Sequence, residues 1–247
     1  MIRKITSLSI LLLLFSMEAL AGPGGAIAKG LFTTFWGKLF LVLLVIIFLP
    51  FIIVSLIRGR IKQARTRKAL NHLATQSRLF DPIALNTRMR DVFERVYLSW
   101  NKGDLEDTSE WMNSWYRQNQ QIVHLNNWNE KGLKNHCQVG KIFSITPIHI
   151  QMNQTGESLD GTRVVFKIHA EVIDYLEEVS TSRLVKGEYG FVNNSNLWTL
   201  ELTDGNWKLD NIEENEMLGA YEKLKNVLVP ISQTARNTRG EGSIVKH

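Results

Sequence analysis

The side chains best suited to catalysis or metal binding are four histidines and one cysteine between residues 124 and 169. They are His124, His136, Cys137, His149 and His169. Metal sites and catalytic pairs need such residues at fixed spacings, for example two histidines one helical turn apart beside a carboxylate. No histidine pair in this group has that spacing with a carboxylate partner, and the adjacent His136 and Cys137 direct their side chains apart. We therefore expect no metal, no cofactor and no catalytic residue among them.

The cysteine content adds a second restriction on the chemistry. Cys137 is the only cysteine, so no disulfide can form within the chain, and zinc sites built from several cysteines are excluded. A phosphate-binding glycine loop is also unexpected, because Gly22, Gly24 and Gly25 precede a long apolar stretch and not a nucleotide-binding fold.

The most informative residues are basic and follow that apolar stretch directly. Residues Leu39 to Ile57 are nineteen positions without a charge, which is about enough to cross a hydrocarbon core roughly 30 Å thick as a helix. Six basic side chains come next: Arg58, Arg60, Lys62, Arg65, Arg67 and Lys68. Lys and Arg beside a span stay on the cytoplasmic side. The pattern predicts a transmembrane helix over 39–57 and a cytoplasmic C-terminal part.

The residues on either side of the span have separate expected roles. Residues 58–79 predict a basic juxtamembrane helix, which is either a simple stop-transfer flank or a surface that binds anionic lipid, at about 1 kcal/mol per basic side chain. Residues 1–21 resemble a signal peptide that is cleaved after Ala21, and the alternative is an uncleaved first membrane helix. Residues 22–38 form a Gly-rich and aromatic external linker.

The charge balance argues against nucleic acid as a partner. The first eighty residues carry eleven Lys and Arg and one acid, whereas the rest carry eighteen Lys and Arg and twenty-three acids. The basic isoelectric point therefore belongs to the membrane-proximal part, and the folded module is mildly acidic. A nucleic-acid-binding module needs a basic face.

Residues 80–229 show helices first and then strands. Apolar residues recur at helical spacing from Met89 to Trp100, and further helices are expected between Leu105 and Leu125. From Val139 the apolar period changes to two, with turns at Asp160-Gly161 and Asp204-Gly205. This order predicts an α+β fold with helices packed on one face of an antiparallel sheet. A closing helix is expected over about 214–229, and a disordered tail over 230–247.

Two tryptophans are candidates for a partner surface. Trp111 and Trp115 are four residues apart, so a helix would place them on one face, and exposed aromatic side chains mark interfaces. We expect Trp100, Trp198 and Trp207 to pack in the core instead.

Two stretches of the domain together resemble a known family. The first is Phe80-Asp81-Pro82 followed by Arg90, Val92-Phe93, Trp100 and Gly103-Asp104. The second is Leu197-Trp198-Thr199-Leu200, a hairpin, Trp207-Lys208-Leu209 and Ile212-Glu213. Over about residues 78–215 the chain resembles the Tim-44-like domain of the nuclear transport factor 2-like superfamily, named for a subunit of the mitochondrial import inner membrane translocase. The glycine-rich spacer is shorter than in that family, and the connection 174–188 is unusually acidic.

The resemblance implies a cone-shaped, curved antiparallel sheet with packed helices and a concave pocket. It implies membrane association and protein binding, not catalysis. Together with the basic flank, this leads us to expect a membrane-anchored binding or scaffold protein at the cytoplasmic face of a bacterial inner membrane, with a protein or anionic lipid as partner. Self-association is left open. Two alternatives remain: a membrane-tethered isomerase or dehydratase of the same fold, for which Asp174 and Tyr175 are the candidate residues, and a subunit of an envelope secretion complex with the fold outside.

Overall fold

The computed structural model describes residues 34–153 and 158–231, and the chain divides into two compact units, Met1–Arg58 and Gly59–His247. The predicted signal peptide, most of the linker and nearly all of the tail lie outside the described residues. Within the described part, one helix is long and apolar enough to cross a membrane. This helix, α3 (Phe35–Ala74), has Pro50 inside it and contains the predicted span.

The helix differs from prediction in its length. We expected a span over 39–57 and a separate helix over 58–79, whereas α3 continues without a break to Ala74. The residues after the span, such as Arg58, Lys62 and Ala64, are good helix formers, and a single glycine at Gly59 costs only about 1 kcal/mol within a helix.

The second unit has one further long helix, α4 (Pro82–Lys102). The Asp81 carboxylate accepts hydrogen bonds from the backbone N–H groups of Ile83 and Ala84 at 2.8 and 3.0 Å, which caps the first turn. Gly103 ends the helix with a φ of 74°. The remaining helical segments are short: η1 (Arg78–Phe80), η2 (Glu106–Thr108), α5 (Ser114–Asn119), the π-helical η3 (Gln120–Asn126), α6 (Asn127–Glu130), η4 (Asn215–Met217) and α7 (Leu218–Lys223).

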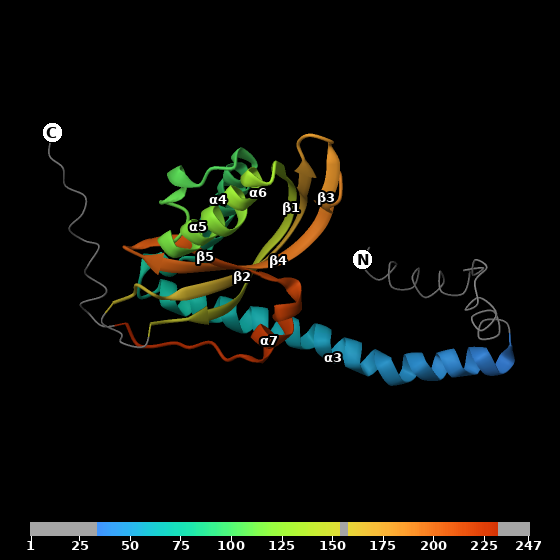
Figure 1. The fold of residues 1–247 in the computed structure, drawn as a ribbon. Coiled ribbons are helices and arrows are strands. Elements are labelled where there is room, and N and C mark those ends of the chain that lie inside the picture. The colour runs from blue at the N-terminus through green and yellow to red at the C-terminus, as the bar shows by residue number, and fades with distance from the viewer. Residues whose placement is uncertain (1–33, 154–157, 232–247) are drawn as a thin grey trace. The chain divides into compact units, whose positions relative to one another are not determined.

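The sheet has five antiparallel strands: β1 (Leu133–Gln151), β2 (Arg163–Glu178), β3 (Arg183–Gly187), β4 (Val192–Thr203) and β5 (Asn206–Glu214). Their order is β1-β2-β4-β5, and β3 pairs with β2. The predicted mixture of helices and an antiparallel sheet is thus confirmed. Helices α4, α5 and α6 lie on one side of the sheet and α7 on the other (Figure 1).

Strand β1 is less regular than the sequence pattern suggests. Its pairing with β2 shifts register between Val139 and Ile142, between Ile142 and Ser144, and between Pro147 and His149. Each shift turns the following side chains toward the other face of the sheet. Ile150 therefore packs in the main core, whereas Ile148 joins a smaller cluster on the opposite face. The period-two pattern that begins at Val139 therefore does not keep the apolar side chains of β1 on one face of the sheet.

The main core is built around Trp198, which is 1% exposed. Its ring centroid lies 4.9 Å from that of Phe93 and 6.2 Å from those of Tyr97 and Trp100, all of which come from α4. Trp207 also packs in this core and donates its indole N–H to the Leu79 carbonyl at 2.9 Å. The core role expected for Trp198 and Trp207 is confirmed, whereas Trp100 is only partly buried and packs against the core.

A buried lysine holds three parts of the second unit together. The Nζ atom of Lys62, on α3, lies 2.6 Å from the Leu224 carbonyl oxygen, 3.0 Å from Oδ1 of Asn226 and 3.3 Å from Nδ1 of His149 on β1. An ammonium group has three donors, and these three acceptors match them. His149 can accept only with an unprotonated Nδ1, so its proton belongs on Nε2.

Lys62 also binds the segment of chain that follows α7. We expected a helix to about residue 229, but after Lys223 the chain becomes extended beside β1. The backbone N–H of Val227 donates to the Ile150 carbonyl, and that of Met152 donates to the Val227 carbonyl, both at 3.0 Å. We call residues 224–231 the C-terminal strap, because they follow the edge of β1 and are bonded to α3 through Asn226.

We predict that protonation of His149 destabilises the fold. Burial and the neighbouring Lys62 charge lower the pKa of His149 from 6.5 to about 4. Between these values the unfolded chain binds a proton that the folded chain does not, so stability falls as the pH drops from 6.5 to about 4. The full loss is on the order of 3 kcal/mol. Thermal unfolding of the full chain in neutral detergent between pH 8 and 4 measures it.

A His149→Gln variant is the matched control, because its amide oxygen can still accept from Lys62 but does not titrate. The carboxylates contribute equally to the pH dependence of stability in the two proteins. The difference between the two stability profiles therefore reports the titration of His149 alone. If the two profiles run parallel, the prediction is wrong.

Candidate functional site

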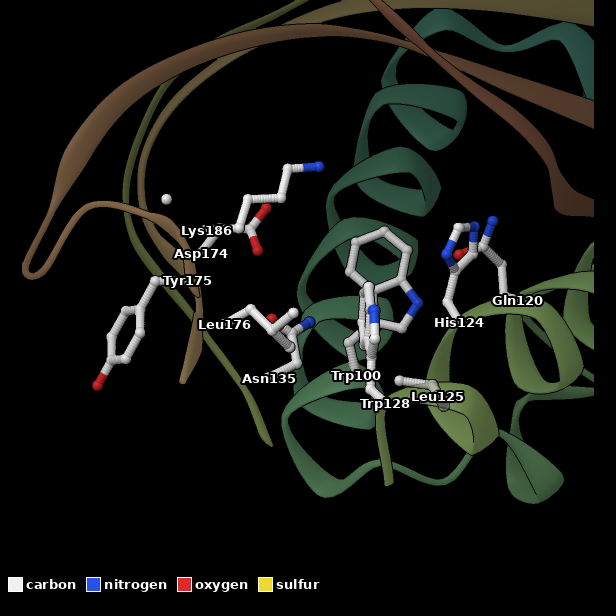
Figure 2. A pocket seen from close by; sticks show the side chains of 11 residues that line it. Trp100, Gln120, His124, Leu125, Trp128, Asn135, Asp174, Tyr175, Leu176 and Lys186 are labelled. Atoms are coloured by element: carbon white, nitrogen blue, oxygen red, sulfur yellow. The ribbon is translucent and has the colours of Figure 1, made fainter. Parts of the chain in front are cut away.

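One hollow of the second unit has two tryptophans in its wall, and we call it the tryptophan pocket (Figure 2). Its volume is about 240 Å³. Trp100 comes from the end of α4 and Trp128 from α6. The polar side chains that line the pocket are Gln120, His124, Asn135, Asp174 and Lys186, beside Tyr175.

The tryptophan pocket owes one of its sides to a glycine. Gly187, the last residue of β3, has a φ of 87°, and a Cβ atom there would come within 2.4 Å of the Asp174 carbonyl oxygen. Only glycine tolerates both the conformation and this close approach. The chain then continues to β4. Both β3 and β4 pair with β2. Gly187 thus brings Lys186 to the pocket beside Asp174.

A π-helical segment builds the opposite side. In η3 the wider turn directs His124 and Gln120 toward the pocket, and the His124 ring lies 5.4 Å from that of Trp128. Segments of π-helix are rare and occur frequently at functional sites. The apolar-period argument expects an ordinary α-helix here, so the sequence did not predict this geometry.

Asp174 is the acidic side chain among the residues that line the pocket. Its Oδ1 accepts from the Cys137 thiol at 3.7 Å, and Asn135 donates to the Cys137 sulfur at 3.0 Å. Crowding of the carboxyl group by protein atoms raises the pKa of Asp174, while Cys137 and Lys186 act in the opposite direction.

The Cys137 thiol, which donates to Asp174, has low reactivity. Cys137 is 5% exposed, and burial, together with the negative charge of Asp174, raises the pKa of its thiol far above the ordinary value. Tyr97, also buried, has a raised pKa for the same reasons. A protonated, buried thiol is a poor nucleophile. Cys137 therefore positions Asp174 and does not attack a substrate.

Tyr175 borders the tryptophan pocket as Asp174 does, but the two side chains point in different directions. The Tyr175 side chain points away from the other labelled residues (Figure 2) and stacks on His136 with ring centroids 4.6 Å apart. Neighbouring residues of a strand face opposite sides of the sheet. The two residues named for an isomerase or dehydratase therefore lie on different faces, and both lie inside β2, not at a strand end.

The two candidate partner tryptophans are not on one helical face. Trp111 precedes α5, in a segment where the Leu209 N–H donates to the Trp111 carbonyl and the Asn113 N–H donates to the Leu209 carbonyl. Trp111 lies in a turn and Met112 forms a bridge with Leu209 of β5, so no helix joins Trp111 to Trp115 and the helical spacing does not apply. The Trp111 ring lies between the guanidinium groups of Arg88 and Arg95, each 4.1 Å from its centroid.

Trp115 remains open to a partner, with 55% of its surface exposed. Its indole N–H donates to Oδ1 of the buried Asp210 at 3.0 Å, which fixes the ring. Asp210 also pairs with Arg163 at 3.0 Å. Burial acts to raise the pKa of Asp210, but its hydrogen bonds with Glu201, Trp115 and Asn113 outweigh this, and its pKa is lowered. The ring is thus a rigid surface feature.

The six basic residues after the span do not share one environment. Lys62 is 5% exposed and bonded inside the second unit as described, so it does not face solvent. The other five are exposed, namely Arg58, Arg60, Arg65, Arg67 and Lys68. Desolvation and the nearby Arg65 lower the pKa of Lys62.

The histidines have ordinary structural surroundings, with one exception. His169 lies 2.9 Å from the Ser195 hydroxyl, and His149 accepts from Lys62. Only His124 borders the tryptophan pocket. No group of three or more metal-binding side chains occurs in the described residues. Of the pocket residues, Asn135 and Lys186 carried no signal in the sequence, because polar residues at single positions in strands are common.

The comparisons with known proteins leave the family of this chain open. No family model and no curated protein matches it. Among solved structures, it is similar to the crystal structure of the intermembrane space region of the chloroplast protein ARC6, at 8% identity and a TM-score of 0.38, over 54% of this chain and 95% of that one. A similarity this low supports no argument about function.

We predict that the Cys137 thiol resists alkylation in the folded protein. Its burial and raised pKa should make labelling by N-ethylmaleimide at pH 8 about a hundredfold slower than in the denatured chain. Mass spectrometry of the full chain over time measures the rate, and Cys137 is the only native site. A Ser180→Cys variant adds an exposed thiol in the turn after β2 as a fast control. Equal labelling rates at both positions would contradict the assigned burial.

Proposed function

We propose that this chain is a membrane-anchored binding protein whose Tim-44-like domain holds a partner at the cytoplasmic face of a bacterial inner membrane. The observation that carries the proposal is the combination of one apolar helix, long enough to cross a membrane, with a separate folded unit that has an aromatic hollow. The run of basic residues on one side of the apolar stretch supports the cytoplasmic orientation.

The pocket chemistry favours binding over catalysis. A volume of about 240 Å³ is below the usual range of roughly 300–1,000 Å³ for small-molecule sites and suits a side chain or a short segment of a partner. Trp100 and Trp128 offer aromatic faces, Asp174 an acceptor and Lys186 a donor. Such a mixture accommodates the apolar and charged parts of one peptide segment.

The family and the cone shape belong to this proposal. The Tim-44-like assignment rests on the residues between Phe80 and Glu213, and helices on one face of an irregular, bulged sheet are compatible with a cone. Anionic lipid is the second proposed partner, through the five exposed basic residues that follow the span. Cleavage of the signal peptide remains a prediction.

One observation favours a second function. Asp174 is a carboxyl with a raised pKa in a hollow, which is a feature of acid–base sites. If the protein is a membrane-tethered isomerase or dehydratase, Asp174→Asn should abolish turnover in a screen of small carbonyl and hydroxy compounds. Turnover that survives in Asp174→Asn would remove Asp174 from such a role.

We predict that the C-terminal part lies in the cytoplasm. A C-terminal tag should be cut by added protease in inverted inner-membrane vesicles and protected in right-side-out vesicles. A periplasmic marker protein and a cytoplasmic one verify the vesicle orientation. Cleavage only in right-side-out vesicles would overturn the proposed orientation and favour a subunit of an envelope secretion complex.

We predict that the tryptophan pocket contacts the partner. A photo-crosslinking amino acid at His124, on the rim, should capture a protein in cells, and Trp128→Ala should reduce that product severalfold. The same crosslinker at the exposed Leu98 of α4 is the control for random collisions. A product of equal yield from both positions, or one that Trp128→Ala leaves unchanged, would contradict a role for the pocket.

A further inference from the structure

A second hollow of the folded unit combines positive charge with an exposed apolar side chain. It lies between the later part of α3 and the start of α4, with Pro147 of β1 in its wall, and has a volume of about 520 Å³. We call it the arginine groove. Its lining includes Arg67 and Asn71 on α3 and Ile83, Thr87 and Arg90 on α4.

The spacing of these residues explains why they face one groove. Arg67 and Asn71 are four residues apart on α3, and Ile83, Thr87 and Arg90 follow at steps of four and three on α4. Helix positions three and four apart lie on one face. The two faces therefore present one arginine and one neutral polar side chain each, with an isoleucine at the start of α4.

The positive charge in the arginine groove is not neutralised within the protein. No acidic side chain lines the groove, and Arg67 has no ion pair or hydrogen bond among the described residues. Arg90 has only Glu94, at 4.0 Å and one turn away on the surface, and exposed pairs of this kind contribute little. Two guanidinium groups, of which one has no partner and the other only a long surface ion pair, suit a phosphate, whose oxygens accept bidentate hydrogen bonds.

The exposed apolar side chain of the groove, Ile83, favours a lipid as the ligand. Ile83 is 80% exposed, the highest value among the large apolar side chains of the described residues. Its position beside two arginines reproduces the pattern of surfaces that bind membranes, where basic groups contact headgroups and an apolar group enters the acyl boundary. A free phosphate would use the arginines alone and leave Ile83 in water.

We propose that the arginine groove binds the headgroup phosphate of an anionic phospholipid between Arg67 and Arg90, with Ile83 against the acyl chains. This deepens the proposed function, on which it rests for a bilayer near the folded unit. The groove is a discrete site, in contrast to the diffuse attraction that the basic run exerts on a charged surface.

The experiment counts phosphatidylglycerol bound to the full chain in neutral detergent by native mass spectrometry over a lipid titration. Arg67→Gln/Arg90→Gln should weaken binding of the first lipid about tenfold, the effect of roughly 1.4 kcal/mol. Arg78→Gln/Arg183→Gln removes the same charge from exposed positions outside the groove and should change affinity less than twofold. All these positions are exposed, and thermal unfolding verifies that each variant folds.

A second arm separates lipid from free phosphate. Ile83→Ser should weaken phosphatidylglycerol binding about threefold, and inorganic phosphate at millimolar concentration should fail to displace the lipid. Unchanged lipid binding in Ile83→Ser together with displacement by phosphate would overturn the lipid assignment. Equal losses in the two double variants, or no loss in either, would overturn the site itself. Because detergent has no sidedness, a failure here is distinct from a failure of the topology prediction.

Discussion

The arrangement of the folded unit depends on how one buried cation is solvated. Lys62 follows the membrane-span candidate by five residues, where a lysine normally faces water or lipid headgroups. Its ammonium group instead donates to three acceptors. They are Nδ1 of His149 on β1, and the Leu224 carbonyl oxygen and Oδ1 of Asn226 in the C-terminal strap. A buried charge without such partners costs several kcal/mol. The C-terminal strap supplies two of the three acceptors, so burial of the Lys62 charge requires the strap to lie beside it.

The strap in turn completes the sheet. By pairing with Ile150 and Met152 it occupies the free edge of β1, which would otherwise present unpaired backbone groups. Asn226 also donates to the Thr66 hydroxyl, and that hydroxyl donates to the Ile148 carbonyl. A few polar side chains thus connect α3, β1 and the C-terminal residues, whereas the opposite face of the sheet is held by the apolar cluster around Trp198.

The sequence predicted the elements whose signals are local. The Asp81-Pro82 start and Gly103 end of α4 were predicted because capping chemistry lies within a few residues. The hairpin at Asp204-Gly205 was predicted for the same reason, and both residues have positive φ. The α+β class followed from the change of apolar period. The tryptophan pocket was not predicted, since it joins side chains from α4, η3, α6, β1, β2 and β3 that no local pattern connects.

The errors also have physical causes. A period-two pattern cannot reveal the register shifts of β1, because each inserted residue changes the face without changing composition. The helical spacing of Trp111 and Trp115 was overridden by backbone pairing with Leu209, a contact distant in sequence. Lys62 looked like its basic neighbours, and only the fold shows that it alone turns inward. For Trp111 and Lys62, hydrogen bonds to residues distant in sequence outweighed a local preference.

The separation of the two proposed sites follows from their chemistry. The tryptophan pocket has aromatic walls with one acid and one lysine, so it carries little net charge and suits a peptide segment. The arginine groove has no acid and an exposed isoleucine, so it attracts phosphate beside an apolar phase. Because the two hollows share no lining residue, lipid in one does not occupy the other. A protein that holds a partner at a membrane needs both functions at once, and two independent sites allow it.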